Sequence, residues 1–346
     1  MAFQAQWNRM REIIEVSESF LLTSHLFPEA DSIGSEVALA LHLRQLGKEV
    51  VIVNDTPPLD RYSFLTRLHP VGSMEDLGPH PDPDRFDVAF TLDVSTWDYT
   101  GEVGDWLRRA GTSVVAIDHH HSQERFGVLD VIMEEAASAG EVLYHYFRAT
   151  GARITPPMAE ALYASILFDT HGFRLSNTKN ETLRVATELL DLGADHRHVS
   201  AQLFERESWA RIHLLRLALG TLQRECDGRL VWLTISEDLF RLADAEFVDG
   251  DGILDFLLGL HGVEVCAMFR QLGTEGIKAT FRSKGKQDVG ALAEELGGGG
   301  RSTASGALLR TSMHDAIRAV LPRVYAVLGA RDPVPVETSL SSPWVS

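Results

Sequence analysis

The sequence predicts an α/β protein with an N-terminal parallel-sheet α/β domain and a smaller C-terminal α/β domain with a mixed or antiparallel sheet. Its 346 residues allow two domains, each with its own core. In residues 1–185, apolar runs rich in β-branched residues alternate with helical patterns, which is typical of a parallel sheet covered by helices. Residues 263–272 and 276–283 alternate in polarity around a Gly-Thr-Glu-Gly turn, which predicts an antiparallel pair.

The predicted strands of the first domain are short apolar runs that end in polar residues. They cover residues 19–25, 49–55, 86–94 and 112–118. Helical periodicity follows the first run and stops at Gly47. Ligands bind beyond the carboxyl ends of the strands in open parallel sheets. The polar residues after these runs therefore indicate one composite site.

Composition and periodicity divide the chain into four stretches. We expect a first domain over residues 1–185, a helical connector over 186–228 and a second domain over 229–330. Residues 331–346, rich in Pro and Ser, are expected to form a flexible tail.

The charge balance limits the kind of partner. Lys and Arg number 32 and Asp and Glu number 49, so the formal net charge is 32 − 49 = −17. A surface that neutralises many phosphates of a long nucleic acid is usually basic, so such a partner is not expected. An anionic substrate remains compatible, because cations or bound metals can reverse the field inside one site.

Targeting and redox signals are weak. No segment approaches the about 18 consecutive apolar residues of a membrane span, and the first residues resemble a short amphipathic helix rather than a secretory signal. Cys226 and Cys266 provide neither a disulfide framework nor a metal-ligand spacing. We therefore expect a cytoplasmic protein that does not bind membranes.

A first group of candidate metal ligands follows the first strand. His25, Glu29 and Asp31 offer one imidazole and two carboxylates from a single loop at a helix start. Such nitrogen and oxygen donors suit a divalent ion such as Mn²⁺. The alternative is that Asp31 or Ser32 caps the helix.

Further candidates follow the other apolar elements. Asp93 ends the third strand, Asp118, His119 and His120 end the fourth, and Asp169 ends an apolar helix over 158–168. Individually these residues also suit caps, turns or a solvated histidine loop. Together with the first loop they provide about six ligands, which is the number that two adjacent metal ions need.

This order of motifs resembles the DHH phosphoesterase family. The matching pattern is His-x-x-x-acid-x-Asp, then Asp, then Asp-His-His, then Asp-Thr. Phe-Arg-Ser (281–283), four glycines (297–300) and Ala304-Ser305-Gly306 are similar to the family's associated C-terminal domain. Size and layout are most similar to its nano-RNase and pAp-phosphatase branch.

The resemblance implies two Mn²⁺ ions, for which Mg²⁺ or Co²⁺ could substitute. The first would be held by His25, Glu29 and Asp93. The second would be held by Asp31, Asp93, His119 and Asp169, with Asp93 bridging the two.

It also implies roles for the remaining residues of the Asp-His-His segment. Asp118 would orient His119, and His120 would lie against the scissile phosphate or the leaving oxygen. The resemblance assigns no role to His121, and we expect its loss to be tolerated.

In the second domain, the resemblance implies a phosphate site. Glycines let backbone N–H groups approach a phosphate, and arginine and serine side chains add donors. The expected substrate-binding residues are Arg282, Ser283, Gly299, Gly300, Arg301, Ser302 and Ser305. The alternative for the glycines alone is a flexible linker.

Three positions depart from the family pattern. The family usually has Asp where this chain has Glu29, Gly where it has His171, and His where it has Arg301. Arginine is a good bidentate partner of phosphate. The third change is therefore compatible with phosphate binding.

The function implied is hydrolysis of short RNA oligonucleotides and of 3′-phosphoadenosine 5′-phosphate (pAp), in an active cleft between the two domains. The alternatives are a phosphodiesterase of cyclic or linear dinucleotides, an exonuclease of short single-stranded DNA, a pyrophosphatase and a catalytically silent nucleotide sensor. The resemblance also suggests a homodimer.

Overall fold

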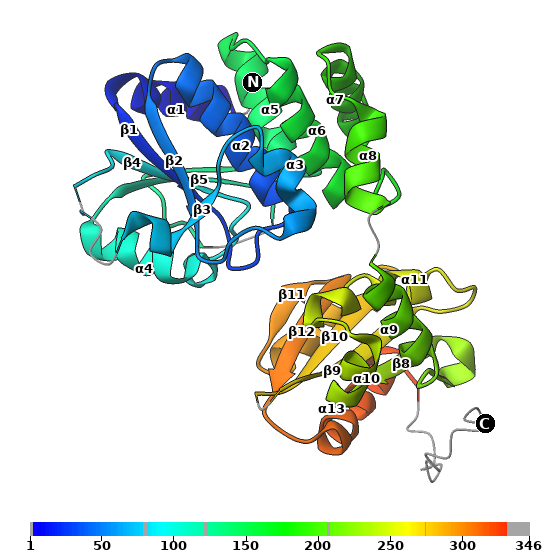
Figure 1. The fold of residues 1–346 in the computed structure, drawn as a ribbon. Helices are drawn as coiled ribbons and strands as arrows, with labels where there is room; N and C mark the ends of the chain where they lie inside the picture. Colours follow the sequence, from blue (N-terminus) through cyan, green and yellow to red (C-terminus); the bar gives the residue numbers. More distant parts are fainter. Residues whose placement is uncertain are drawn as a thin grey trace. The chain divides into compact units, whose positions relative to one another are not determined.

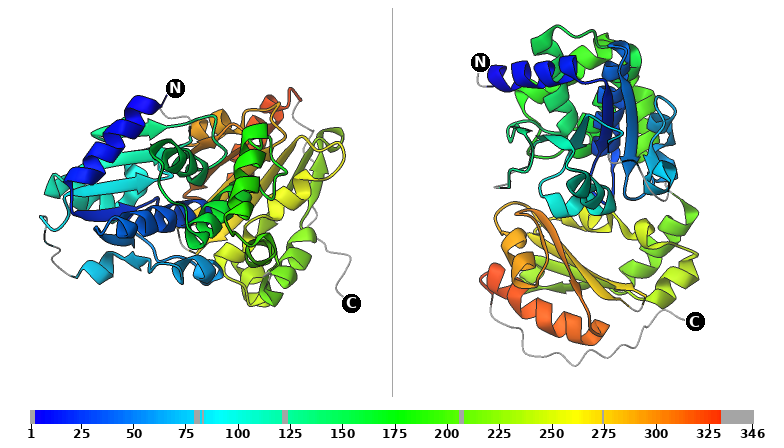
Figure 2. Two further views of the ribbon diagram at one scale, coloured as in Figure 1. Left: turned by 90° about the horizontal axis from the view of Figure 1, so that it is seen from above. Right: turned by 90° about the vertical axis from the view of Figure 1, so that its left-hand side faces the viewer.

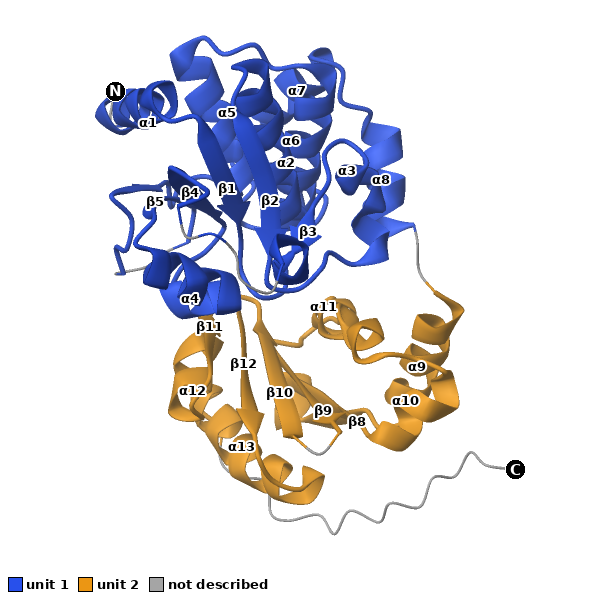
Figure 3. Cartoon of the chain, turned by 60° about the vertical axis from the view of Figure 1, so that its left-hand side comes forward, with its two compact units in different colours: residues 1–206 blue, residues 207–346 orange. Residues whose placement is uncertain are grey.

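The computed structural model describes residues 3–78, 82, 84–120, 124–205, 208–273 and 275–330. The predicted tail at 331–346 and His121 lie outside these residues. The chain divides into two compact units, Met1–Arg206 and Glu207–Ser346 (Figure 3). Within the described residues, no helix is long and apolar enough to cross a membrane.

The first unit is built on the predicted parallel sheet. Its six strands lie in the order β3-β2-β1-β4-β5-β6, and every neighbouring pair is parallel. The strands are β1 (Ser19–Thr23), β2 (Glu49–Asn54), β3 (Gly72–Ser73), β4 (Val88–Leu92), β5 (Ser113–Asp118) and β6 (Leu129–Ile132). The order reverses between β1 and β4. Ligands in open α/β sheets bind at such a reversal, beyond the carboxyl ends of the strands.

Helices cover both faces of this sheet (Figures 1 and 2). One face packs against α1 (Gln4–Val16), α2 (Ala30–Gln45), α3 (Ser63–Thr66), α5 (Ala139–Thr150) and α6 (Pro156–Asp169), and the other against α4 (Gly101–Ala110). Alternate residues of β1 pack into the two cores on opposite faces of the sheet. Phe20 and Leu22 belong to the core beneath α1, α2, α3, α5 and α6, and Leu21 belongs to the core beneath α4.

Helices α2 and α6 lie unusually close together. A Cβ atom added at Gly34 would meet the carbonyl oxygen of Ala161 at 2.5 Å, so only glycine fits there. The close approach brings the first turn of α2, with Asp31, to the last turns of α6, where Ser165 and Asp169 lie.

The predicted connector is divided between the two units. Helices α7 (Asn180–Asp191) and α8 (His196–Phe204) add Val185 and Val199 to the core of the first unit. Helix α9 (Trp209–Leu219) adds Leu214 to a core of the second. The boundary therefore lies at 206/207 rather than at 185 and 228. A run of helical residues shows that helices form but not which core each one joins.

The second unit contains a mixed sheet, in agreement with the prediction. Its order is β11-β12-β10-β9-β8-β7; β8 and β9 are parallel, and all other neighbours are antiparallel. The strands are β7 (Gln223–Glu225), β8 (Leu230–Ile235), β9 (Val265–Leu272), β10 (Gly276–Ser283), β11 (Gly299–Arg301) and β12 (Ala304–Leu309). One face packs against α12 (Val289–Glu295) and α13 (Met313–Val327), and the other against α9, α10 (Glu237–Ala243) and α11 (Ile253–Leu258).

Buried His42 on α2 makes a testable contribution to acid stability. It packs against Phe147, with ring centroids 4.9 Å apart, and burial lowers its pKa to about 4. The unfolded chain, with a pKa near 6.5, binds this proton more tightly, so stability is lost as the pH falls from about 6.5 towards 4, by up to about 3 kcal/mol. We expect His42→Leu to flatten the loss of the melting temperature (Tm) across that window. An unchanged pH slope in thermal unfolding would contradict this.

Candidate metal centre

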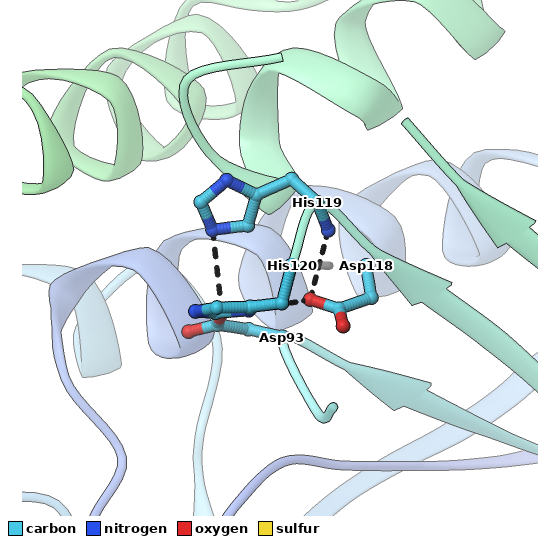
Figure 4. A group of neighbouring side chains, drawn as sticks. All are labelled: Asp93, Asp118, His119 and His120. Atoms are coloured by element: carbon cyan, nitrogen blue, oxygen red, sulfur yellow. Dashed lines mark hydrogen bonds and ion pairs between the residues drawn. The ribbon is translucent and has the colours of Figure 1, made fainter. Parts of the chain in front are cut away.

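Four segments of the first unit place acidic and histidine side chains beyond the carboxyl ends of the central strands. His25 follows β1, Asp93 follows β4, and Asp118 and His119 lie at the end of β5. Two further carboxylates come from helix ends, Asp31 in the first turn of α2 and Asp169 at the last residue of α6. Figure 4 shows how Asp93 lies against the Asp118–His120 segment.

Three carboxylates surround the ring nitrogen Nε2 of His119. Their nearest oxygens lie at 3.4 Å for Asp31, 3.6 Å for Asp93 and 3.7 Å for Asp169. We call these four residues the His119 group. Nε2 of His119 and Oδ1 of Asp93 are buried, and neither has a hydrogen-bond partner among the described residues. Buried polar atoms without partners are costly unless something else compensates them.

The electrostatics of the His119 group fit a bound cation. Burial and the neighbouring Asp93 raise the pKa of Asp31 to about 8. Burial lowers the pKa of His119, but Asp93, Asp169 and Asp31 outweigh burial and raise it to about 10. The negative charges of the three carboxylates therefore favour a positive charge between them. A divalent ion that prefers nitrogen and oxygen ligands supplies such a charge.

Asp31 is held in place by atoms that the sequence did not identify. The hydroxyl of Ser165 donates to its Oδ1 at 2.6 Å, and the backbone N–H groups of Ala139 and Gly140 at the start of α5 donate at 3.0 and 3.3 Å. Ser165 lies one helical turn before Asp169 on α6. Residues four positions apart share one side of a helix, so the spacing from Asp169 could have identified Ser165 as a residue of the site.

A second group forms around His25. Its Nε2 lies 3.6 Å from Oδ2 of Asp93, and the buried Ser32 hydroxyl donates to the same oxygen at 2.8 Å and lies 3.0 Å from Nε2. Burial lowers the pKa of His25, but Asp93 and the exposed Glu29 outweigh it and raise the value. Asp93 touches both groups, as a bridging ligand must.

The backbone of Asp93 is strained. Its φ of 60° lies in the left-handed region, which costs a non-glycine residue roughly 1–2 kcal/mol. Strain of this kind persists where the surroundings enforce it, and it is concentrated at functional sites.

Asp118, which we expected to orient His119, contacts the backbone of His119 and the ring of His120. Its Oδ1 accepts the backbone N–H of His119 at 2.8 Å and lies 2.8 Å from Nδ1 of His120. The ring of His119 instead has its Nδ1 3.3 Å from the carbonyl oxygen of Ala136, which favours a proton on Nδ1 and leaves Nε2 for a metal. In extended chain, residues i and i+2 share a side, so Asp118 faces His120.

Asp118→Asn tests this contact. We expect the hydrolysis rate to fall about 10–100-fold, because a neutral amide holds the His120 ring less firmly, while the amount of bound metal stays unchanged. Steady-state kinetics and elemental analysis measure the two effects. Full activity, or loss of metal, would count against a role through His120.

Asn177, which no sequence motif marked, holds the segment after α6 in place. The side-chain amide of Asn177 donates to the backbone oxygens of Asp169 at 3.0 Å and Ala137 at 3.2 Å. His171, where the family pattern has glycine, adopts a left-handed φ of 51°. The backbone at this position therefore has a conformation that glycine adopts readily.

The predicted substrate residues of the second unit do not all share one surface. Arg282 is half-buried, and its Nε donates to Asp255 at 3.1 Å. Ser283 and Ser305 are buried, and their hydroxyls donate to the carbonyl oxygens of Gln287 at 2.7 Å and of Val289 at 2.5 Å. These two hydroxyls are therefore engaged inside the unit.

The glycine run is partly a strand. Gly299, Gly300 and Arg301 form β11 and pair with β12, while Ser302 is exposed after it. Four glycines in a row carry no alternating pattern, so no strand was expected there.

The chain is similar to proteins of one known family. Residues 19–166 match the DHH family, N-terminal domain, and residues 242–327 match the DHHA1 domain. The bifunctional oligoribonuclease and PAP phosphatase NrnA of Thermus thermophilus is 31% identical over 310 residues, which cover 88% of this chain and 89% of the relative.

Two solved structures share the fold. An exopolyphosphatase-related protein from Bacteroides fragilis superposes with a TM-score of 0.88 at 23% identity, covering 94% of this chain and 97% of that one. RecJ of Thermus thermophilus in complex with Mn²⁺ superposes with a TM-score of 0.55 at 16% identity, covering 96% of this chain and 55% of RecJ. With its acidic and histidine cluster, its DHHA1 domain and a relative matched over most of its length, the chain belongs to the DHH family of phosphoesterases and is a hydrolase.

Proposed function

We propose that the protein hydrolyses short RNA oligonucleotides to mononucleotides and pAp to AMP and phosphate. The observation that carries the proposal is the His119 group, in which three carboxylates meet one imidazole at the sheet reversal. The name of the Thermus thermophilus relative, oligoribonuclease and PAP phosphatase, supports the substrate class.

We further propose that the site holds two Mn²⁺ ions. His25, Glu29 and Asp93 would hold one, and the His119 group would hold the other. The mixture of imidazole and carboxylate donors and the Mn²⁺ bound by the structurally similar RecJ support this choice. When bound, such ions provide a water of lowered pKa and offset charge on the reacting phosphate.

The remaining residues have roles around the phosphate. Asp118 holds Nδ1 of His120, which keeps the ring beside Asp93, 3.4 Å from its Oδ1. His120 in turn would contact the scissile phosphate or the leaving oxygen. Arg282 in the second unit would bind a terminal phosphate of the substrate.

A substrate panel with Mn²⁺ tests the proposed activity. It comprises RNA and DNA from dinucleotides to long oligonucleotides, pAp, and cyclic dinucleotides. We expect RNA dinucleotides and pAp to be hydrolysed fastest and long oligonucleotides slowly. Turnover confined to cyclic dinucleotides or to DNA, or no turnover at all, would refute the proposed activity.

Two further expectations belong to this proposal. Among the described residues, Cys226 and Cys266 are both free thiols, which supports a reducing compartment such as the cytoplasm. The homodimer suggested by the family resemblance stays a prediction, which sedimentation velocity would test.

A further inference from the structure

Two adjacent residues in the first turn of α2 point into different parts of the metal centre. Successive residues of a helix are rotated by about 100° about its axis, so neighbours face different sides. Asp31 belongs to the His119 group, with its carboxylate 3.4 Å from Nε2 of His119. Ser32 is fully buried and lies beside His25 and Asp93 instead. Each half of the centre thus receives one side chain from this turn.

The hydroxyl of Ser32 does not cap the helix. The cap residue of α2 is Glu29, and no side-chain hydrogen bond caps the helix there. The Ser32 hydroxyl donates to Oδ2 of Asp93 at 2.8 Å and lies 3.0 Å from Nε2 of His25. Serine at a helix start usually serves the backbone N–H groups, so contacts with two candidate metal ligands need another explanation.

The two oxygens of Asp93 face different groups of residues. Oδ1 lies 3.6 Å from Nε2 of His119 and 3.4 Å from Nδ1 of His120 (Figure 4). Oδ2 lies 3.6 Å from Nε2 of His25 and accepts the hydrogen bond of Ser32. A carboxylate that bridges two ions offers one oxygen to each of them. The donors that accompany Oδ2 are therefore the His25 ring and the Ser32 hydroxyl.

These three atoms have the spacing of ligands that share one ion. Around an octahedral ion with bonds of about 2.1 Å, neighbouring ligand atoms lie about 3.0 Å apart and opposite ones about 4.2 Å apart. Oγ of Ser32 lies 2.8 Å from Oδ2 of Asp93 and 3.0 Å from Nε2 of His25, and the last two atoms are 3.6 Å apart. None of these distances reaches that of opposite ligands, so all three atoms fit on one side of an ion.

We propose that the hydroxyl of Ser32 is a ligand of the first Mn²⁺ ion, beside His25, Asp93 and Glu29. The inference rests on the two-ion site of the proposed function and adds a ligand to it. Serine hydroxyls hold a hard divalent ion in the same way in nucleotide hydrolases with a phosphate-binding loop. Ser32 is buried in place, whereas Glu29 is exposed. A donor that is fixed before the ion binds loses less conformational freedom on binding.

Calorimetric titration of the metal-free, full-length chain with Mn²⁺ tests this ligand without measuring activity. The wild type should bind two ions. Ser32→Ala removes only the hydroxyl, and it should raise the Kd of one ion at least about tenfold while the Kd of the other changes little. Ser200→Ala is the matched control, since it makes the same change at a half-buried residue of α8 outside both ligand groups. Its two Kd values should equal those of the wild type.

A sulfur atom at the same position distinguishes a ligand from a residue that only holds Asp93. Sulfur ligands favour soft ions over hard ones, so Ser32→Cys should shift the preference of one site from Mn²⁺ towards Cd²⁺ at least about tenfold. A thiolate-to-Cd²⁺ charge-transfer band should appear in the ultraviolet spectrum. Ser200→Cys should show neither change beyond the background of the free thiols Cys226 and Cys266.

The outcomes separate this ligand from the proposed function. Wild-type Kd values in a folded Ser32→Ala variant, or a Ser32→Cys variant that binds Cd²⁺ as the wild type does, would overturn the Ser32 ligand and leave the two-ion site standing. Fewer than two ions bound by the wild type would refute the two-ion site and the ligand together. The expected metal binding in all variants, without hydrolysis of any substrate, would support the ligand and refute the proposed activity alone.

Discussion

Replacing Asp93 by asparagine will lower the Mn²⁺-dependent hydrolysis rate by at least about 10³-fold while leaving the fold intact. Asp93 contacts His25, His119 and His120 at 3.4–3.6 Å, so it joins the two groups of ligands. Asparagine has the same shape and tolerates its left-handed backbone, but it lacks the charge. The variant therefore removes the bridging carboxylate and little else.

The control for this variant is Asp98→Asn, which makes the same chemical change at an exposed residue of the first unit. It should retain full activity. Circular dichroism and thermal unfolding should show that both variants are folded. Hydrolysis of RNA dinucleotides by the Asp93 variant at the wild-type rate would show that the metal assignment is wrong.

Removing metal will have the second largest effect. We expect EDTA to abolish hydrolysis, and Mn²⁺ to restore it and to stabilise the first unit selectively. A ligand at 100 times its Kd adds about 2.7 kcal/mol, which raises the Tm of a domain of this size by about 5–10 °C. Differential scanning calorimetry can follow the two units if they unfold separately.

The pattern of the Tm change distinguishes the site from nonspecific binding. The second unit should keep its Tm, because no described residue group there resembles the metal cluster. The Asp93→Asn variant should lose most of the stabilisation of the first unit. Equal stabilisation of both units, or of the variant and the wild type, would indicate that Mn²⁺ binds elsewhere.

The sequence predicted the central strands because they are buried on both sides and therefore read as continuous apolar runs. The sequence did not predict the strands at the edges of the two sheets. Strand β3 has two residues, Gly72 and Ser73, and is too short to carry a pattern. The glycine run was expected to bind phosphate through its backbone, and its pairing as a strand was not predicted: residues 299–301 pair as β11, because backbone pairing with β12 does not depend on side chains.

The candidate ligands were predictable because parallel strands end at one edge of the sheet. The residues that hold the candidate ligands in place were not predictable. Ser32 bonds to Asp93 across 61 positions of the chain, and Ser165 bonds to Asp31 across 134. The contact between Asp118 and the ring of His120 was not predicted either, since a motif gives the order of residues but not the side of the backbone to which each one points.

Anomalous diffraction at the Mn²⁺ absorption edge, from crystals soaked in Mn²⁺, tests whether the first unit binds two ions that share Asp93. We expect two peaks in the first unit, both with Asp93 as a ligand. One should lie within the His119 group, and the other should lie between His25 and Asp93. Well-occupied peaks elsewhere, or no peak beside Asp93, would contradict the two-metal site.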